Sequence, residues 1–241
     1  MSRVKILNVY FHKVSMKEAV NKVINILDNE NNNSKMVFTP NPEIVMIAQK
    51  QKRLIDVLNN GDLVVPDGIG IVKAAKLLNN PVPERVAGYD LVQGVFEKIS
   101  KTNKTVYFFG AAPGIVDSAK KIMETKYPGL KIVGTVDGYF DKQREEQIVE
   151  DINKVKPDLL LVGLGAPKQE YWIYNNRSRL KVKLCIGVGG SFDVMSGNIK
   201  RAPKWMIKLN LEWFYRLIKQ PTRIKRMIQL PLFIFKVKRS K

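Results

Sequence analysis

One aspartate, in the stretch Val64–Gly70 (VVPDGIG), is the first candidate for acid–base chemistry. Asp67 follows an apolar run typical of a buried strand and precedes a helix-like segment. Ligands of an open parallel sheet bind beyond the carboxyl ends of its strands, so this position is one that a substrate can reach. Two interpretations stay open: Asp67 is a general base, or it caps the helix that starts near Ile69.

Few other side chains could share this chemistry. His12 is the only histidine, in a strand-like stretch, and Cys185 is the only cysteine, in the apolar run LCIGVGG. A zinc site needs a His/Cys cluster, and a Ser-His-Asp triad would need His12 to leave its own segment. We therefore expect a structural His12, a carboxylate as any general base, and no disulfide, as in a reducing compartment.

Further polar side chains follow other strand-like segments. Thr39 and Asn41 lie in FTPNPE, and Gln169 follows GAP at a helix start. Each has a structural alternative. Asn41 before Pro42 is a good N-cap, and Gln169 could be a solvated glutamine in a first helical turn. As functional groups, they would face the same edge of the sheet as Asp67.

Basic charge is concentrated near the C-terminus. The chain has 41 Lys/Arg and 22 Asp/Glu, for a net charge of +19. Residues 200–241 contain 13 Lys/Arg and one acid, Glu212, whereas residues 1–199 carry a net charge of only +7. We therefore divide the chain into a catalytic body, 1–199, and a basic appendage, 200–241, that meets an anionic partner.

The appendage combines its basic residues with regularly spaced apolar ones. Helical spacing relates Trp205, Met206, Leu209, Trp213 and Leu217, which predicts one helix over 203–219. Pro221 separates it from a second helical segment that begins at Thr222, and the apolar run LPLFIF follows. This pattern is typical of a helix in a membrane interface, although a helix packed on the body with a solvated basic face has the same signature. A nucleic-acid-binding appendage is the rival from another class. The run LPLFIF suits acyl chains better than bases, so we expect no nucleic-acid partner.

Arginine also suits a diphosphate, which a guanidinium fork binds in two places. The chain has no Asp-x-Asp pair of the kind that holds a metal against a nucleotide sugar. We therefore expect arginine to stabilise a departing diphosphate, with no metal and no other cofactor.

Strand-like and helix-like segments alternate along the body. The strand-like segments lie at 35–40, 62–68, 104–114, 130–140, 158–167 and 183–193, and the later ones are continuous apolar runs. Such runs indicate a parallel sheet covered on both faces. A helix is also predicted at 14–27, where Ser15 and Glu18 have capping-box spacing. The fold class is therefore α/β: an open, mostly parallel sheet with helices on both faces and a helical basic appendage.

Several blocks together carry a resemblance to a known family. They are FTPNPE, VVPDGIGIV, ERVAGYDL, FFGAAPG, GLGAPKQE and GVGGSFDVMSGNIKRAPKW with LEWFYRLIKQPTR, spanning about Met36 to Arg226. In this order and spacing they resemble the WecG/TagA/CpsF glycosyltransferase family, and the lysine-rich chain is most similar to its TagA branch. The resemblance implies a Rossmann-like sheet and a C-terminal appendage that reaches the membrane.

The implied reaction is specific. It moves N-acetylmannosamine from UDP-N-acetylmannosamine to the 4-hydroxyl of undecaprenyl-diphosphate-linked N-acetylglucosamine, with a β-linkage, in wall teichoic acid synthesis. Another donor, glucose or N-acetylmannosaminuronic acid, is the alternative within the family. One departure from the family pattern is Asn210, where glycine is expected.

The resemblance also assigns roles to individual residues. Asp67 matches the general base, Thr39 and Asn41 match sugar-pocket positions, and Arg85 and Gln169 match active-site positions. The basic positions of the appendage correspond to Arg216, Arg223 and Arg226. For uridine we select Tyr139 and Asp193.

The location of the protein is inferred from what its sequence contains. The N-terminal segment has too short an apolar core for a signal peptide, and no apolar run reaches the roughly 18 residues of a spanning helix. We therefore expect a cytoplasmic protein, peripheral on the inner face of the plasma membrane. The oligomeric state stays open, with a homo-oligomer as one candidate.

Overall fold

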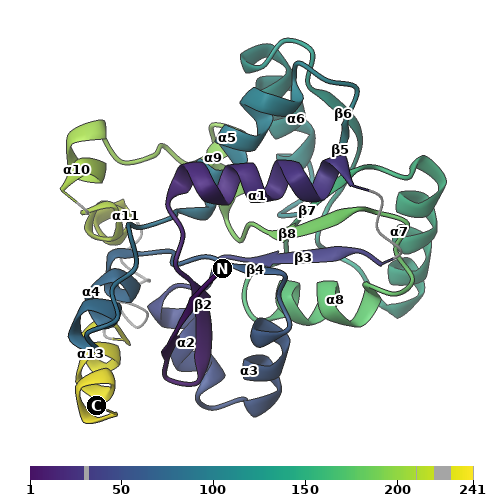
Figure 1. Ribbon diagram of the computed structural model, residues 1–241. Coiled ribbons are helices and arrows are strands. Elements are labelled where there is room, and N and C mark those ends of the chain that lie inside the picture. The colour runs from purple at the N-terminus through teal and green to yellow at the C-terminus, as the bar shows by residue number, and fades with distance from the viewer. Residues whose placement is uncertain (30–32, 210, 220–228, 241) are drawn as a thin grey trace.

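A six-stranded parallel sheet forms the centre of the protein (Figure 1). The computed structural model describes residues 1–29, 33–209, 211–219 and 229–240. The strand order is β4-β3-β8-β7-β5-β6, and all of the strand pairs are parallel. The strands are β3 (Lys35–Phe38), β4 (Leu63–Val64), β5 (Thr105–Gly110), β6 (Lys131–Val136), β7 (Leu159–Gly163) and β8 (Leu184–Gly187).

Helices cover both faces of this sheet, as predicted. Every residue of β7 and β8 is buried, so these strands need the continuous apolar sequences they have. Along β7, Leu159 and Leu161 contribute to one core cluster, and Leu160 and Val162 to the other. One face packs against α1 (Met16–Asp28), α5 (Gly88–Ile99), α6 (Ile115–Lys126) and α9 (Ser191–Met195). The other packs against α2 (Pro42–Ala48), α3 (Lys52–Asn59), α4 (Ile69–Leu77), α7 (Lys142–Val155) and α8 (Lys168–Asn176).

The first helix begins where the sequence predicts it. Ser15 accepts a hydrogen bond from the Glu18 backbone N–H, and the Glu18 side chain accepts from the Ser15 backbone. This reciprocal capping box satisfies two N–H groups that the helix cannot pair itself. The predicted capping box of α1 is confirmed.

An antiparallel hairpin precedes α1 and packs beside α3 and α4. It consists of β1 (Arg3–Ile6) and β2 (Val9–His12). His12 is 4% exposed, and its Nδ1 accepts a hydrogen bond of 2.9 Å from the Val64 N–H in β4. Burial, with the nearby Arg3 charge, lowers the pKa of His12 to about 4. The imidazole is therefore neutral near pH 7 and joins the hairpin to the sheet, consistent with the expected structural role.

The C-terminal segment differs from the expected arrangement. One helix was predicted over 203–219, but the structure has α10 (Lys204–Lys208) and α11 (Glu212–Lys219). Between them, the Leu211 N–H donates to the Met206 carbonyl at 2.8 Å, which turns the chain. The turn allows Met206 and Glu212 both to be buried, which explains the break. Asn210, where the family pattern has glycine, lies outside the described residues.

The last helix, α13 (Gln229–Arg239), packs against α2 and α4. Its Phe233 and Val237 are fully buried in the same core as the hairpin and β3. Among the described residues, none of the helices combines the length and hydrophobicity needed to cross a bilayer.

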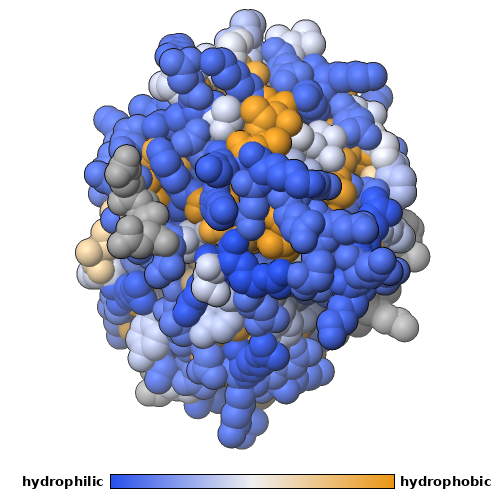
Figure 2. Space-filling model, turned by 90° about the vertical axis from the view of Figure 1, so that its right-hand side faces the viewer, coloured by the Kyte–Doolittle hydropathy of each residue, from blue (hydrophilic) through white to orange (hydrophobic). Residues whose placement is uncertain are grey.

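Exposed hydrophobic side chains are unevenly distributed over the described surface. Of the twelve large ones that are exposed, six lie between residues 205 and 235: Trp205, Leu209, Phe214, Ile218, Leu232 and Phe235. The face on the side of α7, away from these helices, is mostly hydrophilic with separate hydrophobic areas (Figure 2).

Candidate functional site

A cleft of about 350 Å³ lies at the carboxyl edge of the sheet. Loops that follow β3, β4, β7 and β8 supply one part of its wall, and α11 and α13 supply another. Six of the residues selected from the sequence line it: Thr39, Asn41, Asp67, Arg85, Gln169 and Asp193. The fold therefore brings together side chains that are up to 154 positions apart in the sequence.

Asp67 is held in the cleft by the turn after β4. The next residue, Gly68, has φ +86°, and a Cβ there would lie 3.3 Å from Pro42 Cδ. Glycine therefore permits both the turn and the close approach of α2. The Asp67 Oδ2 accepts a hydrogen bond of 3.4 Å from the Gly88 N–H, at the first residue of α5. The N-cap of α4 is Gly68, so Asp67 is not the N-cap residue of this helix.

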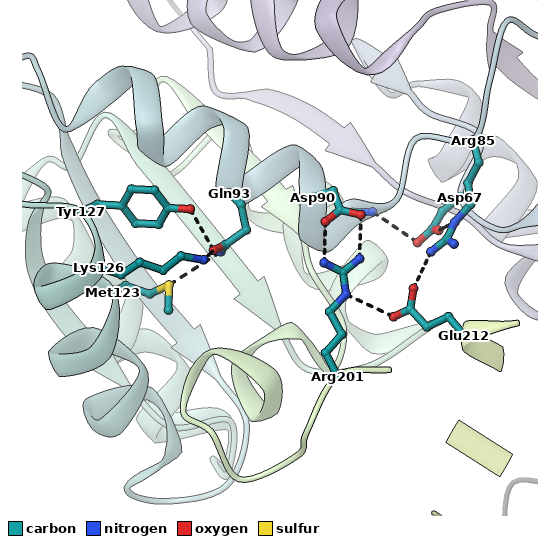
Figure 3. Close-up of polar contacts among 10 residues, drawn as sticks. Asp67, Arg85, Asp90, Gln93, Met123, Lys126, Tyr127, Arg201 and Glu212 are labelled. Atoms are coloured by element: carbon teal, nitrogen blue, oxygen red, sulfur yellow. Dashed lines mark hydrogen bonds and ion pairs between the residues drawn. The ribbon is translucent and has the colours of Figure 1, made fainter. Parts of the chain in front are cut away.

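Asp67 lies at one end of a chain of charged side chains (Figure 3). Arg85 Nε is 3.7 Å from Asp67 Oδ1, and Arg85 Nη2 is 2.8 Å from Glu212 Oε2. Glu212 Oε1 is in turn 3.6 Å from Nε of Arg201. Both terminal nitrogens of Arg201 donate to Asp90, at 2.6 and 2.7 Å. These contacts connect the loop that follows β4 with the helices α5 and α11.

Arg85 keeps its charge in this partly buried setting. Burial alone lowers the pKa of a guanidinium, but Asp67 and Glu212 together raise the pKa of Arg85 above its usual value. Its Nε is buried without a hydrogen-bond partner among the described residues. The site therefore contains a permanently cationic group directly beside the carboxylate of Asp67.

The end of β8 organises two further side chains. Gln169 Oε1 accepts from the Gly189 N–H at 2.9 Å, and Thr39 Oγ1 donates to the Gly187 carbonyl at 3.3 Å. Gln169 is only 3% exposed, so the alternative of a solvated first-turn glutamine is wrong. That alternative failed because the loop after β8 covers the start of α8, which helix position alone does not indicate.

Asn41 has the structural role that its sequence suggested. It is the N-cap of α2, and its Oδ1 accepts from the Ile44 N–H at 3.0 Å. Because Oδ1 is committed to the helix, the amide nitrogen is the group that Asn41 can offer to a ligand in the cleft.

Glu170, next to Gln169, is a buried carboxyl group that sequence reasoning missed. It is 2% exposed; its Oε1 accepts from Gln169 Nε2 at 2.8 Å, and its Oε2 has no hydrogen-bond partner in the described structure. Burial raises the pKa of Glu170 to about 6. Together with Gly189, Glu170 fixes both ends of the Gln169 amide.

Other selected residues are not brought to this cleft by the described structure. Tyr139, on the loop between β6 and α7, is 67% exposed and does not line the cleft. Its assignment to uridine stays a prediction. Arg223 and Arg226 lie outside the described residues, and only the backbone of Arg216, in α11, is described.

The appendage supplies lining residues that were not predicted as site residues from the sequence: Lys200, Glu212, Trp213, Tyr215, Lys219 and Leu230. A signal for Glu212 was present, because it is the only acid in residues 200–241. No group of three or more His, Cys, Asp or Glu side chains in the described part of the chain is arranged to hold a metal ion.

The chain is similar to known proteins over nearly all of its length. Residues 4–241 match the family described as "Glycosyl transferase WecG/TagA/CpsF family". The chain belongs to this glycosyltransferase family. It is therefore an enzyme of the glycosyltransferase class, and the resemblance seen in its sequence blocks is confirmed.

Three relatives share one name, N-acetylglucosaminyldiphosphoundecaprenol N-acetyl-beta-D-mannosaminyltransferase. The chain is 42% identical to that of Bacillus subtilis (strain 168) over 202 residues, covering 84% of this chain and 78% of the relative. It is 39% identical to that of Bacillus spizizenii (strain ATCC 23059 / NRRL B-14472 / W23) over 205 residues, covering 85% and 79%. It is 33% identical to that of Staphylococcus aureus (strain MW2) over 240 residues, covering 100% and 94%.

Proposed function

We propose that this glycosyltransferase moves N-acetylmannosamine from UDP-N-acetylmannosamine to the 4-hydroxyl of undecaprenyl-diphosphate-linked N-acetylglucosamine, forming a β-linkage. The observation that carries the proposal is the shared name of relatives that match 84–100% of the chain. This reaction would place the enzyme in wall teichoic acid synthesis. The position of Asp67 in the cleft supports a mechanism for it.

In this mechanism Asp67 is the general base. Inverting transfer needs one group to remove the proton of the acceptor hydroxyl as that oxygen attacks the anomeric carbon. A carboxylate held by the turn at Gly68 and by the Gly88 N–H is directed into the cleft, where such a hydroxyl would bind. Thr39 and Asn41, which also line the cleft, would contact the sugar, and Gln169 would contact the donor.

Cationic side chains would stabilise the departing UDP. The leaving diphosphate gains negative charge as the glycosidic bond breaks, and fixed cations lower the energy of that state. Lys219 lines the cleft together with Arg85. We assign the same role to Arg216, Arg223 and Arg226 of the appendage, and the uridine to Asp193 and Tyr139. The reaction as proposed uses no metal or other cofactor.

The acceptor lipid also requires contact with a membrane. The exposed apolar side chains of α10, α11 and α13 lie among the basic residues of the appendage. Apolar groups can enter the headgroup region, while each basic residue near an anionic leaflet contributes about 1 kcal/mol. We propose peripheral binding of the appendage to the cytoplasmic leaflet.

A panel of donors tests this function. The purified protein is incubated with UDP-N-acetylmannosamine, UDP-glucose and UDP-N-acetylmannosaminuronic acid, each with a diphosphate-lipid N-acetylglucosamine analogue. We expect a disaccharide-lipid product only with the first donor, and NMR of the product should show a β-1,4 linkage. Transfer from either other donor in preference would contradict the assignment of the sugar, and transfer from none would contradict the assignment of the reaction.

A further inference from the structure

Glu212 occupies an unusual position between two arginines. It is 5% exposed, at the first residue of α11, and it is the single acid of residues 200–241. One carboxylate oxygen accepts from Arg85 at 2.8 Å, and the other lies 3.6 Å from Arg201. A buried carboxylate needs such partners, since an unpaired one costs several kcal/mol.

Arg201 provides a fixed support for Glu212. Its terminal nitrogens form a bidentate pair with Asp90 of α5, and its guanidinium stacks 4.6 Å from the ring centre of Tyr89. A guanidinium bound on two sides and stacked on a ring has little freedom to move. Glu212 is therefore held in place by a group anchored to the body of the protein.

Arg85 is shared unequally between two carboxylates. Its contact with Glu212 is a hydrogen bond of 2.8 Å, whereas its Nε is 3.7 Å from Asp67, beyond hydrogen-bonding distance. Loss of the Glu212 charge would remove the nearer partner and allow the guanidinium to close on Asp67. A closer cation makes a carboxylate a weaker base.

We propose that Glu212 is a positioning residue: it holds the Arg85 guanidinium beside Asp67 without letting it close, and so couples the docking of α11 to the assembly of the site. This inference rests on the proposed function, because it assumes that Asp67 is the base. Proton removal by Asp67 then depends on a docked appendage through Arg85, in addition to any direct contact that the appendage makes.

Graded substitutions test the role of the carboxylate. Glu212→Gln keeps the side-chain length and one acceptor but loses the charge. We expect kcat to fall by about 10- to 100-fold, the equivalent of one charge-assisted hydrogen bond, with KM for the UDP-sugar changed less than about threefold. Glu212→Asp, which keeps the charge, should recover part of the loss. The control Glu97→Gln, at an exposed position of α5, should retain wild-type kinetics.

A double-mutant cycle asks whether Glu212 acts through Arg85. In an Arg85→Lys background, Glu212→Gln should lower kcat by no more than about threefold, because the residue through which it acts is already altered. Fully multiplicative losses would overturn the proposal, as would equal activity of Glu212→Gln and wild type.

Hydrogen exchange separates positioning from general loss of structure. In Glu212→Gln, backbone amides of α11 and of residues 85–88 should exchange faster, while those of β7 and β8 stay protected. Exchange unchanged at 85–88 would overturn the coupling. This readout needs no turnover: an inactive wild-type protein would refute the proposed function, and the exchange pattern would still decide the role of Glu212.

Discussion

Asp67 is the side chain on which the proposed transfer depends. Asp67→Asn should fold normally, because an amide oxygen can still accept from the Gly88 N–H. It cannot remove a proton from the acceptor, so turnover should fall by about 100-fold or more. Turnover measured with the UDP-sugar and the lipid analogue checks this. Asp56→Asn, at an exposed position of α3, is the control, and near-normal turnover of Asp67→Asn would exclude Asp67 as the base.

The raised pKa of Glu170 leads to a prediction about how the stability of the protein depends on pH. Its pKa is about 6 in the folded protein and 4.5 in the unfolded chain. Because folding raises this pKa, the contribution of Glu170 to the free energy of unfolding is full below pH 4.5 and is lost as the pH rises through 6. The shift of about 1.5 units corresponds to about 2 kcal/mol.

Replacement of Glu170 by Gln removes this titration. Wild type should therefore lose stability as the pH rises, and the variant should not. The difference in free energy of unfolding, Glu170→Gln minus wild type, should increase by about 2 kcal/mol between pH 4.5 and pH 7.5. Urea unfolding at both pH values measures it, with the exposed Glu97→Gln as control. A difference that does not change with pH would mean that Glu170 has an ordinary pKa.

The cations of the cleft lead to a prediction about metals. If arginine and lysine side chains stabilise the leaving diphosphate, then transfer should continue in excess EDTA at close to its untreated rate. The assay is product formation with and without chelator. Loss of activity that Mg²⁺ restores would show that a divalent cation performs this role.

At the scale of single elements, the buried imidazole of His12 connects the N-terminal hairpin to strand β4. The pKa of His12 is lowered from 6.5 to about 4, so its contribution to stability is full above pH 6.5 and is lost as the pH falls toward 4. Protonation would remove the acceptor of the Val64 N–H and place a charge in the core. The shift of about 2.5 units corresponds to about 3 kcal/mol.

His12→Asn tests this junction, because the Asn oxygen can replace Nδ1 as acceptor but does not titrate. We expect the variant to be less stable than wild type at pH 7.5, by about 1–2 kcal/mol for the lost packing, and to lose less stability between pH 6.5 and 4. Urea unfolding across this range measures both. An unchanged pH profile would show that His12 titrates normally in the folded state.

At the scale of the whole molecule, exposed apolar side chains and basic charge coincide at the C-terminal helices. Deletion of residues 200–241 is a poor test of membrane binding, because it would also remove Phe233 and Val237 from the core. Point substitutions of exposed residues avoid this problem. Trp205 and Leu209 are suitable, since they are 60% and 62% exposed.

The double variant Trp205→Ser/Leu209→Ser should bind anionic liposomes at least about tenfold more weakly than wild type, with an unchanged melting temperature. Flotation measures binding. Val155→Ser, which removes an exposed apolar side chain at the end of α7, is the matched control. Equal flotation of the double variant would refute binding through α10, and retention of DNA on a filter would favour the nucleic-acid alternative.

The sequence by itself determined much of the local structure. Apolar runs predicted the buried strands, the spacing of Ser15 and Glu18 predicted the start of α1, and strand–helix alternation predicted the α/β class. These features depend on the preferences of neighbouring residues, which a sequence displays directly. It also placed Thr39, Asn41 and Asp67 at one edge, because parallel strands end together.

Only the tertiary structure decided how these parts meet. The strand order, the burial of Gln169 and the bond between Arg85 and Glu212, 127 positions apart, depend on segments that are distant in sequence. Local pattern suggested one helix at 203–219, but burying Met206 and Glu212 required two. Contacts of this kind are set by the burial and pairing of whole elements, and no short stretch of residues carries that information.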